Sequence, residues 1–446
     1  MKIRFIIASV LVFILFAGSK AQDVNIGAST VHDENIFDVH TPLSDQITNF
    51  ELNVSKDWDF DESYINLGYS GAFLLFRDLP QRTYHLHTLS LETTFHFTRE
   101  EDEEESSDEE SSSEEDSADG ETAHRADSIA AHQSVTAHSD SLDRFLYLRA
   151  VGTSQFNKSD FSQFDNTLAA AEATLRQPLG LLASVRPSYR FGYHTFPNLT
   201  GISYFENNFS AGLGTSAIPN GWITVTPGVG VKKYISSNFT YTYSVGGSNQ
   251  SGHGKGGAGG GQRTRTIDLN TPSVRQFFIT FAWTQNVSPA TVLKAAYSYL
   301  DAPSTVARLL PEQVNTGVDQ RGIGDGLAAL NSQNEIFDDH YGYSGNQAIL
   351  NIQQTAPFAI ILTAAFAFQH KKYTLSVQEF DSTAANLGIR LDDRSESVLN
   401  ISRTFPLSQG KSLKPQVEVT FIRNGSNVAY YDFSKTTFLV GAEFNF

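Results

Sequence analysis

The stretch SKTTFLVGAEFNF, residues 434–446, ends the chain. Every second position in it is apolar, and the intervening positions are mostly polar or small. The apolar set consists of Phe438, Val440, Ala442, Phe444 and Phe446. Alternation with period two is typical of a strand with two different surroundings, because successive side chains point to opposite faces. The stretch therefore predicts a final β-strand with one apolar face that ends on a phenylalanine.

A strand of this kind suits a membrane barrel better than the edge of a soluble sandwich, which is the alternative. A membrane barrel turns one face of each strand toward lipid and carries aromatic residues at the interfaces. The strand resembles the last strand of Gram-negative outer-membrane β-barrel proteins, whose terminal aromatic residue is read by the barrel-assembly machinery. The resemblance implies that Phe438, Val440, Phe444 and Phe446 form the membrane-insertion signal. It also implies outer-membrane lipid and the barrel-assembly machinery as partners.

Two short phrases extend the resemblance. HDENIF at 32–37, followed by PLSD at 42–45, resembles a Tyr-Asp-x-Asn-hydrophobic-Phe phrase that precedes the first strand in such barrels, with His32 where Tyr is usual. NGSN at 424–427 and YYDF at 430–433 resemble the phrase before the last strand. Relatives of this kind serve secretion, polysaccharide export and surface-protein assembly. We therefore expect a periplasmic segment at 22–49 and a transmembrane barrel at 50–446.

The beginning of the chain predicts export. Basic residues, an apolar run of 14 residues and a small-residue cleavage site make residues 1–21 a signal peptide. The apolar run is shorter than the roughly 20 residues that a spanning helix needs. The absence of cysteine excludes disulfides, iron–sulfur clusters and a lipid anchor on cysteine. We expect an integral protein of the bacterial outer membrane.

Alternating segments recur along the chain and predict an all-β fold. They favour a single antiparallel transmembrane β-barrel of about 16 strands, each ~9–12 residues long, and 14 strands is the alternative because residues 153–221 are ambiguous. Short connections predict periplasmic turns at 77–80, 287–290, 356–358 and 406–412. Long connections predict extracellular loops at 99–143, 246–273, 301–344 and 371–394.

The segment at 99–143 is unusual in its charge. Fourteen Asp and Glu residues lie between Glu100 and Glu121, and without them the net charge would be −3 rather than −17. Such a run cannot bury apolar surface, so it predicts a disordered acidic extracellular loop. Its carboxylates could hold divalent cations loosely, the only cofactor we expect. His124, His132 and His138 follow, and imidazole suits capture of a transition metal.

Charged residues on the polar sides of strands predict the lining of a lumen. The candidates are Arg186, Arg190, Lys294, Glu92 and Glu418. Such a lining can produce a transverse field that selects solutes by charge, or its charges can pair and close the interior. His85 and His87 share one strand face near an interface, with a bulge expected before Leu89, and we expect no ligand role for them.

No motif indicates catalysis. The segment GHGKGG at 252–257 lacks the Ser or Thr that a phosphate loop carries after its lysine. The step DDH at 338–340 has no second acid–His pair to form a protease site. A near-neutral body gives no support for nucleic-acid binding. We therefore expect a non-enzymatic pore for small polar solutes or export. The alternatives are a structural or assembly barrel with a periplasmic or surface partner, and a surface protein that captures metal cations.

Overall fold

The structure is a computed structural model that describes residues 23–36, 42–97, 144–198, 203–235, 238–244, 262–268, 274–303, 342–376 and 389–446. The expected signal peptide and the expected acidic segment lie outside the described residues, as do the segments at 252–257 and 338–340. No helix among the described residues has the length and apolar composition needed to cross a membrane.

Most of the described residues belong to strands. The long strands are β1 (Asp23–Asp33), β2 (Asp45–Phe60), β3 (Ser63–Phe76), β4 (Tyr84–Phe97), β5 (Arg144–Asn157), β6 (Asn166–Pro178), β7 (Ala183–Thr195), β8 (Tyr204–Thr215), β9 (Gly221–Tyr234), β12 (Val274–Ser288), β13 (Thr291–Ala302), β14 (Tyr343–Ala356), β15 (Ile360–Ser376), β16 (Ile389–Arg403), β18 (Ser412–Ser426) and β19 (Phe433–Asn445). The short strands are β10 (Asn238–Ser244), β11 (Gln262–Asp268) and β17 (Phe405–Pro406).

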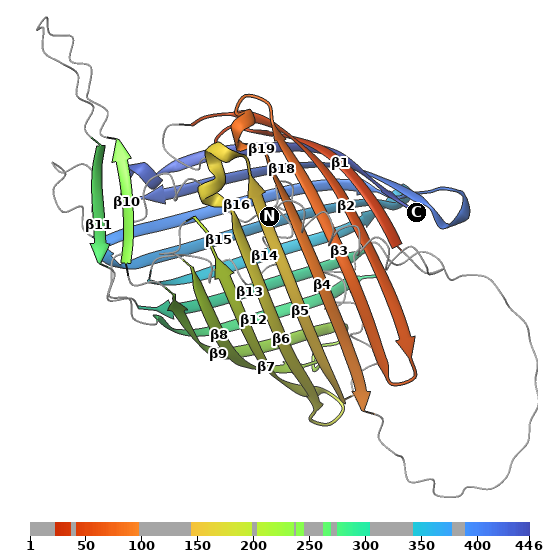
Figure 1. The fold of residues 1–446 in the computed structure, drawn as a ribbon. Helices are drawn as coiled ribbons and strands as arrows, with labels where there is room; N and C mark the ends of the chain where they lie inside the picture. The colour runs from red at the N-terminus through yellow and green to blue at the C-terminus, as the bar shows by residue number, and fades with distance from the viewer. Residues whose placement is uncertain are drawn as a thin grey trace, which may run out of the picture.

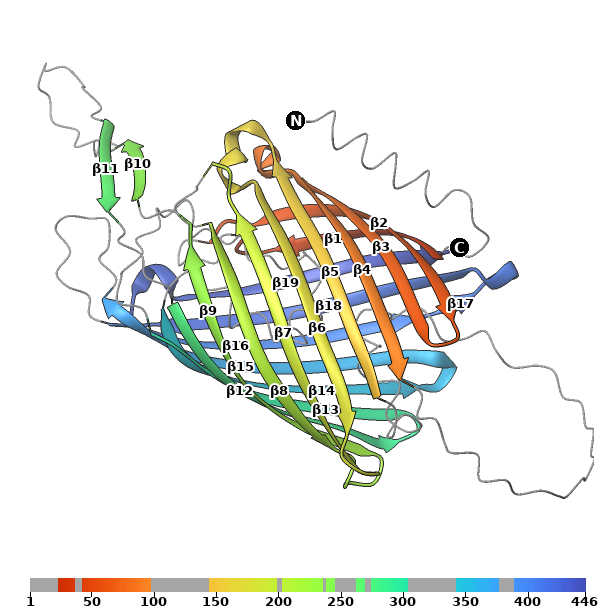
Figure 2. The ribbon, with the colours of Figure 1, turned by 60° about the horizontal axis from the view of Figure 1, so that its bottom comes forward.

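The sixteen long strands close into one antiparallel barrel (Figures 1 and 2). Each pairs with its neighbours in chain order, and β1 closes the ring by pairing with both β2 and β19. Strand β17 only extends the pairing of β18, and β10 and β11 pair with each other. The prediction of sixteen strands is confirmed, and the alternative of fourteen is wrong.

The two faces of the barrel differ as the alternation predicts. Large apolar side chains are exposed on the outward face, including Leu91, Phe191, Phe281, Phe366 and Phe438. Polar side chains are buried on the inward face, including Gln276, Asn351, Asn400, Glu418 and Thr420. An apolar outside and a polar inside are the arrangement of a membrane-spanning barrel, because lipid surrounds it and water or polar groups fill it.

The residues expected to form the insertion signal lie on this outward face. Phe438, Val440 and Phe446 are exposed. The ring of Phe444 lies edge-on to that of Phe446, with 4.5 Å between ring centroids, and the Phe446 amide donates to the Val24 carbonyl across the closure of the barrel (3.0 Å). The aromatic residues Phe438, Phe444 and Phe446 therefore lie on the outward face of the barrel. Recognition by assembly machinery stays a prediction.

The barrel has two unlike ends. We call the end where β1 begins and β19 finishes the turn end, and the opposite end the loop end. Strand order places the connections at 61–62, 179–182, 216–220, 289–290, 357–359 and 404–411 at the turn end. The connections at 235–273, 303–342 and 377–388 belong to the loop end, where β10 and β11 lie (Figure 1). Short turns beside the termini mark the periplasmic end of an outer-membrane barrel.

This order corrects two of the expected positions. The acidic segment joins the end of β4 to the start of β5, and both of these points lie at the turn end, together with the start of β1 and the end of β19. The connection at 77–80 lies at the loop end, opposite to the expected periplasmic turns at 287–290, 356–358 and 406–412. The cause is β1, a strand of 11 residues that lies within the expected periplasmic segment at 22–49. A strand added at the start moves the first connections that follow it to the other end of the barrel.

The phrase at 32–45 therefore does not precede the first strand but connects β1 to β2 at the loop end. Asp33 accepts the Asn35 amide (2.8 Å) and pairs with Lys435 of β19 (3.4 Å). The Glu34 amide donates to the Thr436 carbonyl, and the Thr436 amide donates to the Glu34 carboxylate, both at 3.2 Å. The phrase thus joins the first and last strands where the barrel closes.

A buried carboxylate fixes the neighbouring connection at 77–83. Asp45 is 1% exposed, and its carboxylate accepts backbone amides from Gln46 (2.7 Å), Arg77 (3.1 Å), Asp78 (2.9 Å) and Leu79 (3.0 Å). An ionised carboxylate that accepts several amides is well suited to burial, because each bond to the charge compensates for lost water. Asp45 thus holds β2 to the connection between β3 and β4.

Replacing Asp45 with alanine should lower the free energy of unfolding by about 2–4 kcal/mol, because backbone amides would lose a charged acceptor. Urea unfolding of refolded protein in micelles, followed by tryptophan fluorescence, measures the change. Asp78→Ala is the matched control, since that side chain is exposed, and it should change stability by no more than about 0.5 kcal/mol. Equal effects in both variants would contradict this role of Asp45.

Candidate functional site: the inward wall of the barrel

A row of alternating charges crosses four strands on the inward face. Glu92 of β4, Arg149 of β5, Glu172 of β6 and Arg190 of β7 are successive cross-strand partners. Arg149 Nε lies 3.1 Å from Glu92 Oε1. Glu172 Oε1 accepts the Thr174 hydroxyl at 3.3 Å. Opposite charges that face each other across strands stabilise the pairing of those strands, so this row forms a polarised band along the wall.

Nearer the turn end, two arginines face each other without such compensation. The register from Thr174–Ser188 to Gln177–Val185 sets Arg176 of β6 opposite Arg186 of β7. Arg176 is only 5% exposed, and the Nε atoms of both arginines lack a hydrogen-bond partner. We call these two residues the arginine pair.

Aromatic rings support the arginine pair. The Arg176 guanidinium lies over the Phe145 ring (5.6 Å to its centroid), and that of Arg186 lies over the Trp222 ring (5.4 Å). Among the described residues neither arginine has an ion pair with a carboxylate. Stacking satisfies the flat faces of a guanidinium and leaves its N–H groups available. The pair can therefore offer several donors to an anion.

Carboxylates gather on the opposite part of the wall. In the sixteen-strand ring, β18 lies eight strands from β7 in either direction. Glu418 of β18 accepts the Asn400 side-chain amide (3.2 Å), Glu443 of β19 lies 3.6 Å from Lys414, and Glu396 of β16 accepts from Arg394 (3.4 Å). Here the acids have partners, so the strongest uncompensated charge described on the wall is that of the arginine pair.

The structure places all five expected lumen-lining residues on the inward face. Arg190 and Glu92 belong to the charged row, Arg186 belongs to the arginine pair, and Glu418 lies on the acidic side. Lys294 of β13 stands apart, with Thr284 and Asn351 as cross-strand partners. Their role in transport stays a prediction.

The sequence reasoning missed Arg149, Glu172 and Arg176. Each lies in or beside the zone at 153–221 where strand boundaries were ambiguous. Charge alone gave no signal, because their significance comes from the partners that the strand register places beside them.

The inward wall is packed more tightly near the loop end. Tyr343, Lys232 and Leu300 are less than 2% exposed. The Lys232 ammonium lies 4.2 Å from the centroid of the Tyr204 ring, and Lys371 lies 4.8 Å from that of Tyr343. Cations packed over aromatic faces leave little of this part of the wall exposed.

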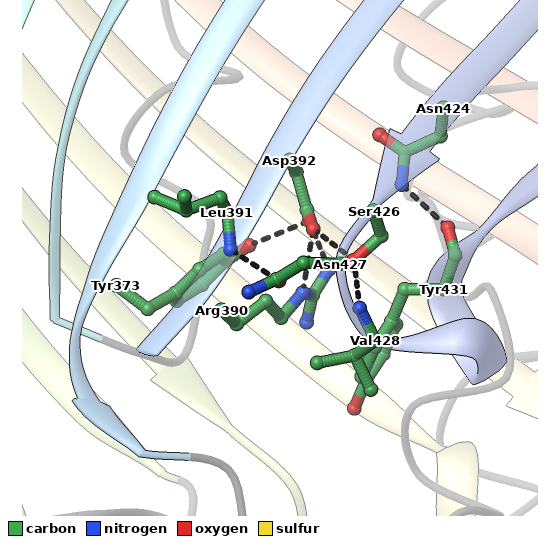
Figure 3. A network of polar contacts seen from close by, with 9 residues as sticks. All are labelled: Tyr373, Arg390, Leu391, Asp392, Asn424, Ser426, Asn427, Val428 and Tyr431. Carbon is green, nitrogen blue, oxygen red and sulfur yellow. Dashed lines mark hydrogen bonds and ion pairs between the residues drawn. The ribbon is translucent and has the colours of Figure 1, made fainter. Parts of the chain in front are cut away.

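A polar network fixes the wall beside these aromatic residues (Figure 3). Asp392 of β16 accepts from Arg390 Nε (2.9 Å), Ser426 Oγ (2.7 Å) and Tyr373 Oη (3.4 Å). The Arg390 guanidinium lies over the rings of Tyr431 and Tyr373, at 3.4 and 4.4 Å from their centroids. The network therefore joins β15, β16, β18 and the turn before β19.

A side chain of the same turn continues the backbone pairing. Asn427 accepts the Leu391 amide with its Oδ1 and donates its Nδ2 to the Ile389 carbonyl, both at 2.8 Å. Asn424 Nδ2 donates to the Tyr431 carbonyl (2.6 Å). The residues at 424–433 thus have a structural role. The side chain of Asn427 bonds backbone groups at the start of β16, and that of Asn424 bonds the backbone of the turn after β18 (Figure 3).

The structure does not test the three histidines expected to capture a metal. His124, His132 and His138 lie outside the described residues. Within the described ranges, no group of three or more His, Cys, Asp or Glu residues is arranged to hold a metal ion.

His85 and His87 differ from expectation. β4 runs without a register shift from Tyr84 to Phe95 against β3, so no bulge precedes Leu89. Both imidazoles therefore share the outward face with Leu89 and Leu91, which are exposed.

No protein-family model matches the chain, and no relative is found among curated proteins. Solved structures with a similar fold include OpdK from Pseudomonas aeruginosa, at 11% identity and a TM-score of 0.41, covering 96% of this chain and 99% of that one. OccK5 (OpdH) from the same organism has 9% identity and a TM-score of 0.39, covering 95% and 98%. A loop-deletion variant of OmpT, an outer-membrane protein of Vibrio cholerae, has 8% identity and a TM-score of 0.37, covering 96% and 98%. Likeness at this level carries no inference about substrate.

Proposed function

We propose that the protein is a non-enzymatic outer-membrane pore that passes small polar solutes and prefers anions. The arginine pair carries the proposal, because two adjacent guanidinium groups without a described carboxylate partner attract negative charge to the wall. A closed ring of sixteen strands is wide enough for an aqueous channel. The carboxylates around Glu418 lie on the opposite side of the barrel. Together with the arginine pair they would produce an electric field across the lumen.

The same features support the proposed location in the outer membrane. An apolar outward face, aromatic residues at the chain end and short turns beside the termini are the properties of barrels in the bacterial outer membrane. The turn end would then face the periplasm. With this orientation the acidic segment would lie on the periplasmic side.

Single-channel conductance of the refolded full chain in a planar lipid bilayer tests the proposal. We expect steady conductance and, under a salt gradient, a reversal potential that shows preference for anions. A refolded barrel that never conducts would overturn the pore. Conductance with cation preference would keep the pore and remove the arginine pair as its selective element.

One observation favours a second function. The nearly complete burial of Tyr343, Lys232 and Leu300 near the loop end suits a barrel that is closed at that end. A closed barrel would serve the cell envelope as a structural or assembly component with a bound partner. The conductance experiment separates the two functions, since a closed barrel gives no current.

A further inference from the structure

The outward face carries one pair of histidines at the loop end of the barrel. His85 and His87 are the second and fourth residues of β4. Their cross-strand partners on β3 are Phe73 and Gly71, and His85 also faces Phe156 of β5. Side chains two apart on a strand lie on the same face. The two imidazoles are therefore held side by side among aromatic residues at the rim of the apolar belt.

The ring nitrogens of the pair lie close together. His85 Nδ1 is 2.9 Å from His87 Nε2, and the other nitrogen of His87, Nδ1, is 2.8 Å from the Tyr69 hydroxyl. A neutral imidazole carries one proton, so one of its nitrogens donates while the other accepts. If His87 Nδ1–H donates to Tyr69, His87 Nε2 presents its lone pair toward His85 Nδ1.

The neighbouring residues hold this arrangement in place. The Tyr69 ring lies over Gly71, where an added Cβ would come within 2.7 Å of the Tyr69 oxygen. A larger residue at this position would therefore displace the Tyr69 hydroxyl from its place beside His87. The Phe156 ring lies 5.3 Å from His85 and 6.2 Å from His87 between centroids, and Phe73 lies 6.4 Å from His85.

We propose that His85 Nδ1 and His87 Nε2 bind one Cu²⁺ ion on the outward face of the barrel. Metal–imidazole bonds are about 2.0–2.1 Å long, and two such nitrogens at a right angle are about 2.9 Å apart. The two nitrogens are within hydrogen-bond distance of each other, and their separation of 2.9 Å also equals that of adjacent ligands of a square-planar ion, the geometry that Cu²⁺ and Ni²⁺ prefer. Among divalent first-row metals, Cu²⁺ binds nitrogen ligands most strongly.

When the ion binds, it replaces the hydrogen bond between His85 Nδ1 and His87 Nε2, and the His85 proton moves from Nδ1 to Nε2, so that each ring keeps one proton. The proton of His85 lies on Nε2 and that of His87 on Nδ1, which donates to Tyr69 Oη. Tyr69 is therefore a positioning residue, because metal-binding histidines commonly donate their second N–H to an acceptor that fixes the ring. Water or an oxygen of a lipid headgroup completes the coordination at the rim.

Other described histidines lack this geometry. His370, also outward-facing, lies 2.6 Å from the Asp393 carboxylate, and its ring contacts no second imidazole in the described part of the chain. His194 is buried between Tyr204 and Asn166. His370 therefore provides a matched control that removes an exposed imidazole and leaves the proposed site unchanged.

Titration of the full refolded chain in micelles with Cu²⁺ alone, followed by electron paramagnetic resonance, tests the site. The parent should bind one ion with a hyperfine pattern from two nitrogens. H85N and H87N should each lose this pattern and bind at least tenfold more weakly, whereas H370N should match the parent. The variant H124N/H132N/H138N should keep the two-nitrogen signal, which separates the proposed site from histidines elsewhere in the chain.

Two further variants keep both ligands and test the positioning. Y69F and G71A should each weaken binding about 10-fold or more, in the range found when an outer partner of a metal ligand is lost, and they stay informative if an asparagine variant fails to fold. A two-nitrogen signal that persists in H87N would overturn the site, as would its loss in the triple variant or parental affinity in both Y69F and G71A. The readout is independent of conductance, so it stands whether or not the barrel is a pore.

Discussion

Replacing both Arg176 and Arg186 with glutamate should reverse the ion preference of the pore from anions to cations. Both arginines of the pair face inward, and the described structure gives neither of them a carboxylate partner. The double change turns two positive charges into two negative ones at the same place. A unit charge about 4 Å away contributes roughly 4 kcal/mol at the effective dielectric constant of a protein surface, so the effect should exceed tenfold in the permeability ratio even after screening by salt.

Reversal potentials under a potassium chloride gradient measure this ratio. Arg423→Glu is the matched control, because Arg423 lies on the exposed outward face and should leave selectivity unchanged. The variant with glutamine at both arginines should be intermediate, since it removes charge without inverting it. Parental selectivity in a conducting double variant would show that ions do not pass beside these arginines, and it would leave the pore itself intact.

Replacing Asp392 with alanine should destabilise the barrel by about 3–5 kcal/mol, the cost of leaving one member of a buried ion pair alone. The side chains of Arg390 and Asp392 are only 10% and 6% exposed. Without the carboxylate, the Arg390 guanidinium would remain buried between Tyr373 and Tyr431, and Ser426 would lose its acceptor.

The next residue supplies the control. Asp393 lies on the outward face, its side chain is 61% exposed, and it pairs with His370. Exposed ion pairs contribute about 0–1 kcal/mol, so Asp393→Ala should have a small effect. Urea unfolding of both variants in micelles measures the two free energies of unfolding. An equally large loss of stability in Asp393→Ala would show that the network in Figure 3 does not stabilise the barrel more than an exposed ion pair does.

The sequence predicts the barrel well because alternation is a local property. In residues 434–446 the polarity of each side chain indicates the face on which it lies. Phe438 and Val440 could therefore be assigned to the outward face without knowledge of the neighbouring strands. The closed ring of sixteen strands follows from many such stretches.

Position along the barrel axis could not be predicted in the same way. It depends on the number of strands that precede a connection, and Asp23–Asp33 alternates too weakly to be identified as a strand. That one omission placed the acidic segment at the wrong end. The charged row and the arginine pair depend on cross-strand register, which brings together residues such as Arg149 and Glu172 that no local pattern connects.

The pairing of β1 with β19 also constrains the order in which the barrel can form. Most neighbouring strands are joined by short connections, whereas Asn25 and Asn445 are separated by nearly the whole chain. Closing a loop of this length costs about 5 kcal/mol in chain entropy, by the logarithmic dependence on length, unless the intervening hairpins have already brought the ends together. We therefore expect hairpins of neighbouring strands to form first. The contacts of Asp33 with Lys435 and of Glu34 with Thr436 should form last. Until then the sheet would have two open edges, each able to pair with another chain.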